Sequence, residues 1–566
     1  MEDTMSTASS TPRQNHRWLG KPSLSSAIRF GVWIASIVYV VLYLLGSVLL
    51  DFFLTEGTQN VVFVIALLAA LIGAYDVKQP KHSVLRNYPV IGHFRWLFEG
   101  IRPEIRQYLI EADDEALPFT RSQRSLVYQR AKAVSADKPF GTIVDVYQNG
   151  YEFMVHSILP APQRNPEDFR VQIGNEQCTQ PYSASIFNIS AMSFGSLSAN
   201  AILALNHGAA RGRFYHDTGE GSISPYHLQG GGDLVWELGS GYFGCRTNDG
   251  KFDPEKFAKQ AVLPNVKMIE IKMSQGAKPG HGGILPKEKI TEQIAQVRGI
   301  PRDRDCVSPA SHSAFSTPLE MMAFIRQLRE LSGGKPVGFK LCIGQPWEFM
   351  AIVKAMLQTE TYPDYVVVDG TEGGTGAAPI EFTDHLGTPL REGLLFVHNT
   401  LVGAGIRDKV KVGASGKIVS AFDIARTLAL GADWVNSGRG FMFALGCIQS
   451  QSCHTNRCPT GVATQDENRQ KALVVGDKSE RVYHFHHNTL KALADMIAAS
   501  GLTHPEQIRP DHLVVRISEL EIKNYRQMHY YMRPSELVSG QTDSPFYARM
   551  WELASAESFH ARPPSH

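Results

Sequence analysis

Tyr365-Val-Val-Val-Asp-Gly-Thr-Glu-Gly-Gly374 is a short apolar run that ends in an acidic, glycine-rich loop. The same pattern recurs along the chain, with helical segments between the runs. The other runs are FNISAMSFG (187–195), FYHDTGEG (214–221), VWELGSGYFG (235–244), MIEIKMSQG (268–276), VGFKLC (337–342), VKVGASG (410–416) and DWVNSGRG (433–440). Continuous apolar strands that alternate with helices are typical of a parallel sheet buried on both faces. The pattern therefore predicts an α/β protein.

Eight such strands between residues 187 and 440 match the size of a (β/α)8 TIM barrel, which takes about 250 residues. A doubly wound open sheet is the alternative. We favour the barrel because polar and glycine residues follow nearly every strand, and in a barrel those strand ends form one functional rim.

Composition narrows the class of protein. The chain has 566 residues, of which 43% are hydrophobic and 20% are charged, and its formal net charge is +1. These values indicate one large domain with accessory segments and exclude a disordered or fibrous protein. The near-neutral charge and the lack of a long basic stripe predict no nucleic-acid partner. Seven cysteines, three of them close together, favour a reducing compartment and a metal site over a disulfide framework.

Two uncharged runs near the N-terminus predict a transmembrane helical hairpin over residues 30–76. Phe30 to Leu50 has 21 residues without a charge, and Gly57 to Tyr75 has 19. A helix of either length can cross a bilayer. Basic residues follow at Lys78, Lys81 and Arg86, and the loop between the runs is acidic.

This charge distribution predicts that both ends face the cytoplasm, as in a multi-pass protein of the inner membrane with its catalytic domain in the cytoplasm. A cleaved signal peptide and a buried hydrophobic hairpin are the alternatives; the first run is too long for a signal peptide and no small-residue cleavage site follows it. The remaining predicted divisions are a polar tail (1–29), a helical transition (77–165), the barrel (166–470) and a C-terminal extension (471–566) containing a helix from His487 to Ser500.

The loops after the last two strands suit a phosphate, because barrels commonly bind one there through backbone N–H groups. These loops are Gly413-Ala-Ser-Gly416-Lys417 and Asn436-Ser-Gly438-Arg439-Gly440; ordinary turn glycines are the alternative. Lys340, near the end of strand five, needs an anionic partner if buried, and a flavin edge would serve. Gly373 and Gly374 follow strand six without a complete dinucleotide fingerprint, so direct NAD(P)H binding is unsupported.

Lys272, Gln275 and Lys278 follow strand four. Two lysines and a glutamine suit a dicarboxylate substrate, although a solvated loop has similar composition. Glu220, after strand two, supplies a carboxylate on the same rim.

Cys447, Cys453 and Cys458 have the spacing C-x5-C-x4-C, and Pro459 follows the last of them. Three cysteine ligands suit a [3Fe-4S] cluster better than a four-ligand cluster. Three buried or reduced thiols are the alternative. Because the run closely follows strand eight, a cluster there would lie near a flavin and act as a one-electron relay.

The chain resembles the FMN-binding domain of glutamate synthase over roughly residues 170–470. The matching segments are Ile189-Ser-Ala-Met-Ser-Phe-Gly195, Thr218-Gly-Glu-Gly221, Glu270-Ile-Lys-Met-Ser-Gln-Gly-Ala-Lys-Pro-Gly280, Gly373-Gly-Thr-Gly-Ala-Ala-Pro379 and the cysteine run with Val-Ala-Thr-Gln465. The resemblance implies a barrel that binds FMN beside a [3Fe-4S] cluster. It also implies that 2-oxoglutarate and ammonia form 2-iminoglutarate, which is reduced to L-glutamate.

The resemblance also implies residue roles. Met192 and Ser193 would line the flavin, Lys340 would meet its pyrimidine edge, and Gly416 and Gly438 would hold its phosphate. Lys272, Gln275 and Lys278 would bind the 2-oxo acid, and Glu220 would lie near the ammonia entrance. The three cysteines would bind iron. With the glycines and the arginine of the rim, the candidate cofactor-binding set is Met192, Ser193, Lys340, Gly373, Gly374, Gly413, Gly416, Gly438 and Arg439.

Departures from the family leave the substrate open. The chain begins Met-Glu-Asp-Thr instead of with a glutaminase cysteine, so ammonia or an amine is expected from solution or a partner. We also expect no counterpart of the glycine-repeat β-helix that follows the family's barrel, because residues 471–566 carry no such repeat. Tyr242 stands where the family has arginine, His312 lies in a changed Ser308-to-Ala314 segment, and the strand-seven motif differs. The chain is similar to stand-alone, membrane-anchored FMN-binding glutamate synthase-like proteins of bacteria.

We therefore predict an oxidoreductase acting on CH-NH2 donors that reductively aminates 2-oxoglutarate or a related 2-oxo acid. Ferredoxin or a separate reductase subunit would donate electrons, and a homo-oligomer is possible. The alternatives are an oxidoreductase acting on an N-alkyl amino acid or a 2-hydroxy acid, and a membrane-tethered electron-transfer module.

Overall fold

Eight parallel strands close into a barrel. In chain order they are β4 (Phe187–Ile189), β5 (His216–Asp217), β6 (Leu234–Leu238), β7 (Val266–Lys272), β10 (Val337–Leu341), β11 (Tyr365–Asp369), β12 (Lys411–Ser415) and β13 (Trp434–Ser437). Each overlaps one of the eight predicted runs, and β13 pairs in parallel with β4 to complete the ring. The predicted barrel is confirmed, and the alternative prediction of a doubly wound open sheet is wrong.

The computed structural model describes residues 24–46, 50, 54–112, 115 and 118–562. The chain divides into two compact units, Met1–Ala112 and Asp113–His566, and the barrel belongs to the second. Residues 1–23 of the predicted tail and 47–49 of the first predicted span lie outside the described part.

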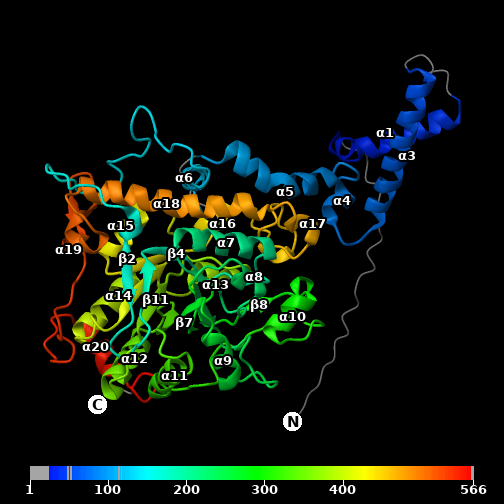
Figure 1. Ribbon diagram of the computed structural model, residues 1–566. Helices are drawn as coiled ribbons and strands as arrows, with labels where there is room; N and C mark the ends of the chain where they lie inside the picture. Colours follow the sequence, from blue (N-terminus) through cyan, green and yellow to red (C-terminus); the bar gives the residue numbers. More distant parts are fainter. Residues whose placement is uncertain (1–23, 47–49, 51–53, 113–114, 116–117, 563–566) are drawn as a thin grey trace, which may run out of the picture. The chain divides into compact units, whose positions relative to one another are not determined.

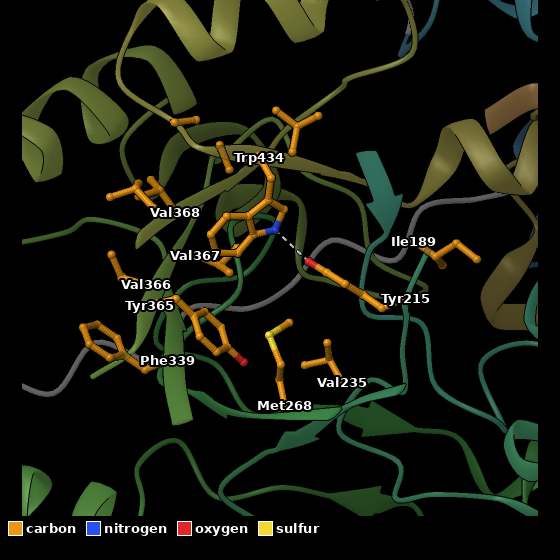
Figure 2. Packing of buried hydrophobic residues seen from close by; sticks show 14 of the residues in the cluster. Ile189, Tyr215, Val235, Met268, Phe339, Tyr365, Val366, Val367, Val368 and Trp434 are labelled. Atoms are coloured by element: carbon orange, nitrogen blue, oxygen red, sulfur yellow. Dashed lines mark hydrogen bonds between the residues drawn. The ribbon is translucent and has the colours of Figure 1, made fainter. Parts of the chain in front are cut away.

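Aromatic side chains with satisfied polar groups fill the barrel. The Trp434 Nε1–H donates to the Tyr215 hydroxyl at 2.7 Å, and these side chains point toward one another (Figure 2). The Tyr215 hydroxyl donates to Asn436 Oδ1 at 2.6 Å, and that of Tyr365 to the Ile269 carbonyl at 2.9 Å. A buried tyrosine or tryptophan usually needs such a hydrogen-bond partner. Because these large side chains fill the interior, the barrel is a packed core and not a pore.

Helices surround the barrel. They are α7 (Ala199–Gly212), α8 (Pro225–Gln229), α9 (Pro254–Ala261), α11 (Pro318–Leu331), α12 (Pro346–Thr359), α14 (Leu390–Gly403), α15 (Ala421–Ala429) and α18 (Val475–Ala499), with a short α16 (Arg439–Leu445) after β13. The long α18 packs on α7, α15 and α16 (Figure 1). A Cβ on Gly208 of α7 would lie 2.4 Å from Val482 Cγ1, so a glycine permits this close approach. The sequence predicts α18 only from His487; it begins earlier, at Val475.

Smaller elements cover the rim and the sides of the barrel. Between β7 and α11 lie β8 (Ile284–Leu285), η3 (Lys287–Lys289), α10 (Glu292–Arg298) and β9 (Cys306–Val307). Near the rim lie α13 (Ile380–His385), η4 (Cys453–Thr455) and α17 (Glu467–Gln470). The remaining elements of this unit are α6 (Arg121–Ala131), β1 (Glu152–Met154), η2 (Pro166–Asp168), β2 (Arg170–Ile173), β3 (Tyr182–Ser185), η5 (Pro505–Gln507), η6 (Pro510–His512), β14 (Leu513–Arg516), β15 (Ile522–Asn524), α19 (Tyr525–Met528) and α20 (Pro545–Leu553). An antiparallel sheet in the order β1-β14-β15 joins the segment before the barrel to the one after it.

The first unit consists of α1 (Leu24–Leu44), α3 (Glu56–Lys78), α4 (Ser83–Asn87), α5 (His93–Ile105) and the π-helical turn η1 (Arg106–Ile110). Helix α1 packs on α3, where the Trp33 Nε1–H donates to the Ala70 carbonyl at 3.0 Å. Among the described residues, α3 alone is long and apolar enough to cross a membrane; the apolar part of α1, Arg29–Leu44, is shorter. The predicted pair of spans is therefore not shown.

Candidate active site

The four candidate catalytic residues come together at the rim. Lys272, the last residue of β7, has its Nζ 3.2 Å from Glu220 Oε1 and donates to Gln275 Oε1 at 3.2 Å. The Gln275 Nε2 in turn donates to the Gly374 carbonyl at 2.8 Å. Lys278 Nζ reaches the Ala377 carbonyl at 3.4 Å. Loops after three different strands thus supply one polar cluster.

Positive charge exceeds negative charge in this cluster. Burial raises the pKa of Glu220, but the nearby Lys272, Lys278 and Arg298 outweigh it and hold that pKa below its ordinary value. The pKa of Lys278 is lowered, mainly by burial and secondarily by Lys272. Three cations therefore surround one ionised carboxylate, which leaves charge to bind an anion.

Lys340 lies inside the barrel among carboxylates. It forms ion pairs with Glu237 and, at 3.5 Å, with Glu270 Oε1. One oxygen from each of Asp217, Glu237 and Glu270 lies within 4.8 Å of the others. These acids supply the anionic partner that a buried lysine requires, so the flavin is not needed to explain it; its contact with a flavin stays a prediction.

Two of the three acids in this cluster have raised pKa values. Burial, followed by the charges of Glu270 and Glu237, raises the pKa of Asp217 well above its ordinary value. The same effects raise the pKa of Glu270 to about 7, although Lys340 opposes them. Like charges at this separation cannot all ionise in a low-dielectric interior. Each acid comes from a predicted strand, but nothing in the spacing shows that they converge.

Met192 and Ser193 lie where loops after three adjacent strands meet. A Cβ on Gly219 would lie 2.7 Å from the Ser193 nitrogen, and a Cβ on Gly438 would lie 3.8 Å from the Met192 sulfur. The Arg298 Nη2 donates to Ser193 Oγ at 3.3 Å. The structure thus brings Met192, Ser193 and Gly438 together, as a shared cofactor site requires; their role stays a prediction.

Arg439 lies against the loop that follows strand six. A Cβ on Gly374 would lie 2.8 Å from Arg439 Nε, and Arg439 Nη2 donates to the Glu372 carbonyl at 2.5 Å. Its guanidinium lies over the ring of Phe119 at 4.7 Å. Burial, partly offset by Asp369 and Glu372, lowers the pKa of Arg439 to about 10. The sequence did not predict a role for Phe119, which lies outside the barrel.

The predicted glycines have different surroundings. Gly413 lies within β12, where a Cβ would lie 2.5 Å from the Trp434 indole, so packing alone explains it. Gly416 follows the strand with a φ of +156°, and Leu390 and Glu372 lie beside it. A Cβ on Gly373 would lie 3.0 Å from the Gly370 carbonyl. The binding of a phosphate by Gly416 and Gly438 stays a prediction.

The cysteine run forms a loop between α16 and α18. Cys447, Cys453 and Cys458 are free thiols; after burial, Cys453 and Cys458 contribute to the raised pKa of Cys447, and Cys458 contributes to that of Cys453. Among the described residues, the only three candidate ligating groups whose donor atoms lie within 4.8 Å of one another are the barrel acids. The three sulfurs do not form such a group among the described residues, and their binding of a metal stays a prediction.

Backbone groups surround one of these sulfurs. Burial raises the pKa of Cys458, but hydrogen bonds from Thr460, Ala463 and Val462 outweigh it and lower that pKa. In contrast, burial raises the pKa of Cys447 to about 12. A metal would be needed to hold Cys447 as a thiolate at neutral pH. N–H groups directed at a cysteine sulfur fit an iron–sulfur cluster, whose presence stays a prediction.

Lys289 joins the cysteine loop to the loop that bears Met192. It is buried, and its Nζ donates to the Ser196 carbonyl at 2.8 Å and to the Cys453 carbonyl at 3.3 Å. Gln465 adds a second connection, because its Nε2 donates to the Leu197 carbonyl at 2.8 Å. Lys289 belongs to the insertion after β7, and no sequence motif indicates it.

Tyr242, which departs from the family pattern, contacts His312 in the changed Ser308-to-Ala314 segment. The Tyr242 hydroxyl lies 2.9 Å from His312 Nδ1, and His312 Nε2 lies 2.9 Å from the Lys272 carbonyl. The Ala314 N–H donates to the Tyr242 hydroxyl at 3.2 Å. Because a carbonyl only accepts, Nε2 carries the proton and Nδ1 accepts from Tyr242. Burial lowers the pKa of His312, consistent with a neutral ring.

A hollow of about 1090 Å³ lies beside the β2–β3 hairpin. Its lining includes Arg170, Tyr182, Arg213, Asp233 and Lys335 but none of the predicted site residues. The convergence of side chains at the rim, and not this hollow, identifies the candidate active site.

The closed barrel with its functional rim places the chain among the (β/α)8-barrel enzymes. Within that class the chain belongs to the glutamate synthase family: the conserved region of glutamate synthase matches residues 154–503.

Named relatives support this assignment. The glutamate synthase large subunit-like protein YerD of Bacillus subtilis is 36% identical over 515 residues, covering 81% of this chain and 97% of that protein. The archaeal-type glutamate synthase (NADPH) of Thermotoga neapolitana is 32% identical over 59% of this chain and 63% of its own length. The archaeal glutamate synthase (NADPH) of Methanocaldococcus jannaschii is 33% identical over 57% of this chain and 60% of its own. The match to a solved structure of a flavocytochrome b2 mutant covers 85% of this chain and 96% of that chain at 14% identity. Its TM-score is 0.39, which is too low to support an inference.

Proposed function

We propose that the chain is an FMN- and iron–sulfur-dependent oxidoreductase that reductively aminates 2-oxoglutarate or a related 2-oxo acid. The observation that carries this proposal is the cationic cluster of Lys272, Lys278 and Arg298 around Glu220 at the barrel rim. Membership of the glutamate synthase family supports it.

The chain's own groups would bind and orient the reactants. Lys272 and Lys278 would bind the carboxylates of the 2-oxo acid, and Gln275 would fix the position of Lys272. Ammonia adds to the keto carbon with loss of water, and the imine carbon then accepts a hydride while its nitrogen gains a proton. FMN, when bound, supplies that hydride. Glu220, ionised beside Lys272, is placed to hold an incoming ammonium ion.

The cofactors would occupy adjoining loops. Met192, Ser193, Gly416, Gly438 and Arg439 would hold FMN, and Cys447, Cys453 and Cys458 would hold a [3Fe-4S] cluster. Electrons would come from ferredoxin or a separate reductase subunit, because the sequence lacks a complete dinucleotide fingerprint.

We further propose that α3 attaches the chain to the inner membrane, with α1 as a second span and the catalytic unit in the cytoplasm. The apolar composition of α3 supports this, and so do the basic residues that follow it.

The test uses the purified full-length chain. Flavin and iron are measured first, and the dithionite-reduced protein is then mixed anaerobically with 2-oxoglutarate and ammonium. We expect flavin reoxidation with formation of glutamate. Lys272→Gln should slow it at least 100-fold, whereas Lys267→Gln, at the other end of the same strand, should not. A flavin that these reactants cannot reoxidise would exclude glutamate synthesis.

A second candidate is an oxidoreductase that acts on an N-alkyl amino acid or a 2-hydroxy acid. Tyr242 favours it, because this neutral residue stands where the family has an arginine, and so the site has one cation fewer. A panel of such substrates, mixed with the oxidised protein, should then reduce the flavin.

A further inference from the structure

Helix α5 of the first unit has one apolar face that is exposed. Phe94, Leu97, Phe98 and Ile101 are 55%, 54%, 59% and 39% exposed. Their spacing of three and four residues places them on one side of the helix. Large apolar side chains in such a row are typical of a surface that contacts another phase or partner.

The neighbouring face of α5 is charged. Arg95 pairs with Glu99 at 2.8 Å, one turn apart, and Arg102 follows on the same side. A helix with an aromatic and aliphatic face beside a face that bears arginine is typical of segments that lie in the plane of a membrane surface.

A hydrogen-bonded tether fixes the start of α5 at the end of α3. Asp76, in the last turn of α3, has its Oδ1 2.9 Å from His93 Nε2, and His93 is the first residue of α5. The Val90 N–H donates to Asp76 Oδ2 at 2.9 Å. Asp76 is buried, so this contact is internal to the unit. Helix α5 therefore begins at the level where the apolar helix α3 ends.

We propose that α5 lies in the interfacial layer of a lipid bilayer. Phe94, Leu97, Phe98 and Ile101 would enter the acyl region while Arg95 and Arg102 contact anionic headgroups. The proposal rests on membrane attachment through α3. We choose lipid as the partner of the apolar face because α5 starts next to the end of α3. A helix that begins where a membrane-spanning helix ends lies at the level of the lipid headgroups. The catalytic unit of the same chain and a second copy are the competing occupants, and the test distinguishes them.

The experiment places the photocrosslinker p-benzoylphenylalanine at single positions of the full-length chain in vesicles of phosphatidylcholine and phosphatidylglycerol. Phe98 reports on the apolar face of α5, Glu99 on its charged face and Val64 on α3. After irradiation, mass spectrometry separates lipid adducts from protein crosslinks. We expect lipid adducts at positions 98 and 64, and at least fivefold fewer at position 99.

Other outcomes would overturn the proposal in distinguishable ways. Lipid adducts at position 64 with protein crosslinks at position 98 would show that the α5 face packs on protein, while the span through α3 stands. Equal lipid labelling at positions 98 and 99 would show no preferred face. The absence of a lipid adduct at position 64 would show that α3 does not cross the membrane. It would also refute the proposal for α5, which rests on that attachment. Unchanged thermal unfolding of each variant confirms that the substitutions are tolerated.

Discussion

At the scale of single residues, the chain Tyr242–His312–Lys272 determines how the site holds its principal lysine. Each hydrogen bond in it has one possible direction, since the Lys272 carbonyl only accepts and the Ala314 N–H only donates. The chain therefore fixes the backbone of Lys272 without adding charge. Tyr242 and His312 are positioning residues in this account, because they reach the substrate only through Lys272.

Replacing Tyr242 by phenylalanine tests that account. The change leaves His312 Nδ1 and the Ala314 N–H without their partner, at a cost of about 1 kcal/mol. We expect the KM for the 2-oxo acid to rise roughly fivefold with kcat changed less than twofold. Tyr182→Phe, whose hydroxyl donates to Asp233 at 2.9 Å away from the rim, is the control. A lower melting temperature with an unchanged KM would assign Tyr242 a purely structural role.

Lys289 is the second residue whose role can be measured directly. Its ammonium is buried against the Cys453 carbonyl, and a nearby positive charge stabilises the reduced form of a cluster. We expect Lys289→Met to lower the reduction potential of the cluster on the order of 50 mV, measured by a titration followed by electron paramagnetic resonance. Lys289→Arg should restore most of the shift, and Lys287→Met, on an exposed neighbour, should cause none. A potential unaffected by Lys289→Met would contradict the assignment.

At the scale of elements, Glu152 connects four parts of the chain. From β1 it accepts hydrogen bonds from Arg391 of α14 at 2.6 and 3.0 Å, from Arg426 of α15 at 3.0 Å and from the Tyr525 hydroxyl of α19 at 2.5 Å. Burial raises the pKa of Glu152, but Tyr525 and the two arginines outweigh it, so that this pKa lies below its ordinary value.

We expect Glu152→Gln to lower the free energy of unfolding by about 2 kcal/mol at pH 7, because it removes a partly buried charge from two arginines. The sign of the pH dependence follows from the lowered pKa. The contribution of the Glu152 charge to stability is complete above about pH 4.3, the pKa of a glutamate in the unfolded chain. It is lost as the pH falls through the lower pKa that Glu152 has in the folded protein. Urea unfolding of both proteins between pH 3 and pH 8 measures it. Glu167→Gln, which breaks an exposed pair with Arg213, should cost far less.

The sequence predicts those features that depend on residues within one short segment of the chain. The eight strands were found because each is a continuous apolar run, such as Tyr365–Asp369, whose residues are all buried. Lys272, Gln275 and Glu220 were placed on one rim because parallel strands end together. The apolar spacing predicts α18 only from His487, because the first turns of this helix are mostly polar, with only Val482, Phe485 and His486 buried.

Contacts between distant segments were not predictable. Lys289 meets Cys453 across 164 residues, and Lys340 meets Glu237 across 103. No periodicity or spacing records such pairs, since they depend on how the insertion after β7 folds over the rim and on which strand residues face inward. The flavin partner predicted for Lys340 shows the consequence: the sequence revealed that a buried lysine needs an anion but did not reveal which one.

At the scale of the whole catalytic unit, the cysteine loop contacts segments from widely separated parts of the chain. The Tyr128 hydroxyl of α6 donates to the Cys447 carbonyl at 2.6 Å. The Ser198 N–H donates to the Val462 carbonyl at 2.9 Å. Asn456 Nδ2 donates to the Glu288 carbonyl at 3.3 Å. The segment before the barrel, the loop after β4 and the insertion after β7 therefore all depend on one loop.

A cluster held by that loop should stabilise the entire unit, because metal binding to the folded state adds to the free energy of unfolding. We expect Cys453→Ser to lose iron and to lower the melting temperature by about 5 °C, measured by differential scanning calorimetry with iron analysis. Cys178→Ser is the matched control: its thiol donates to the Gly334 carbonyl at 3.3 Å, a contact that serine keeps. Chelation of iron from the wild type should reproduce the Cys453→Ser transition. If the wild type contains no iron, or if its removal leaves the transition unchanged, the loop is held by protein contacts alone and the three cysteines are ordinary thiols.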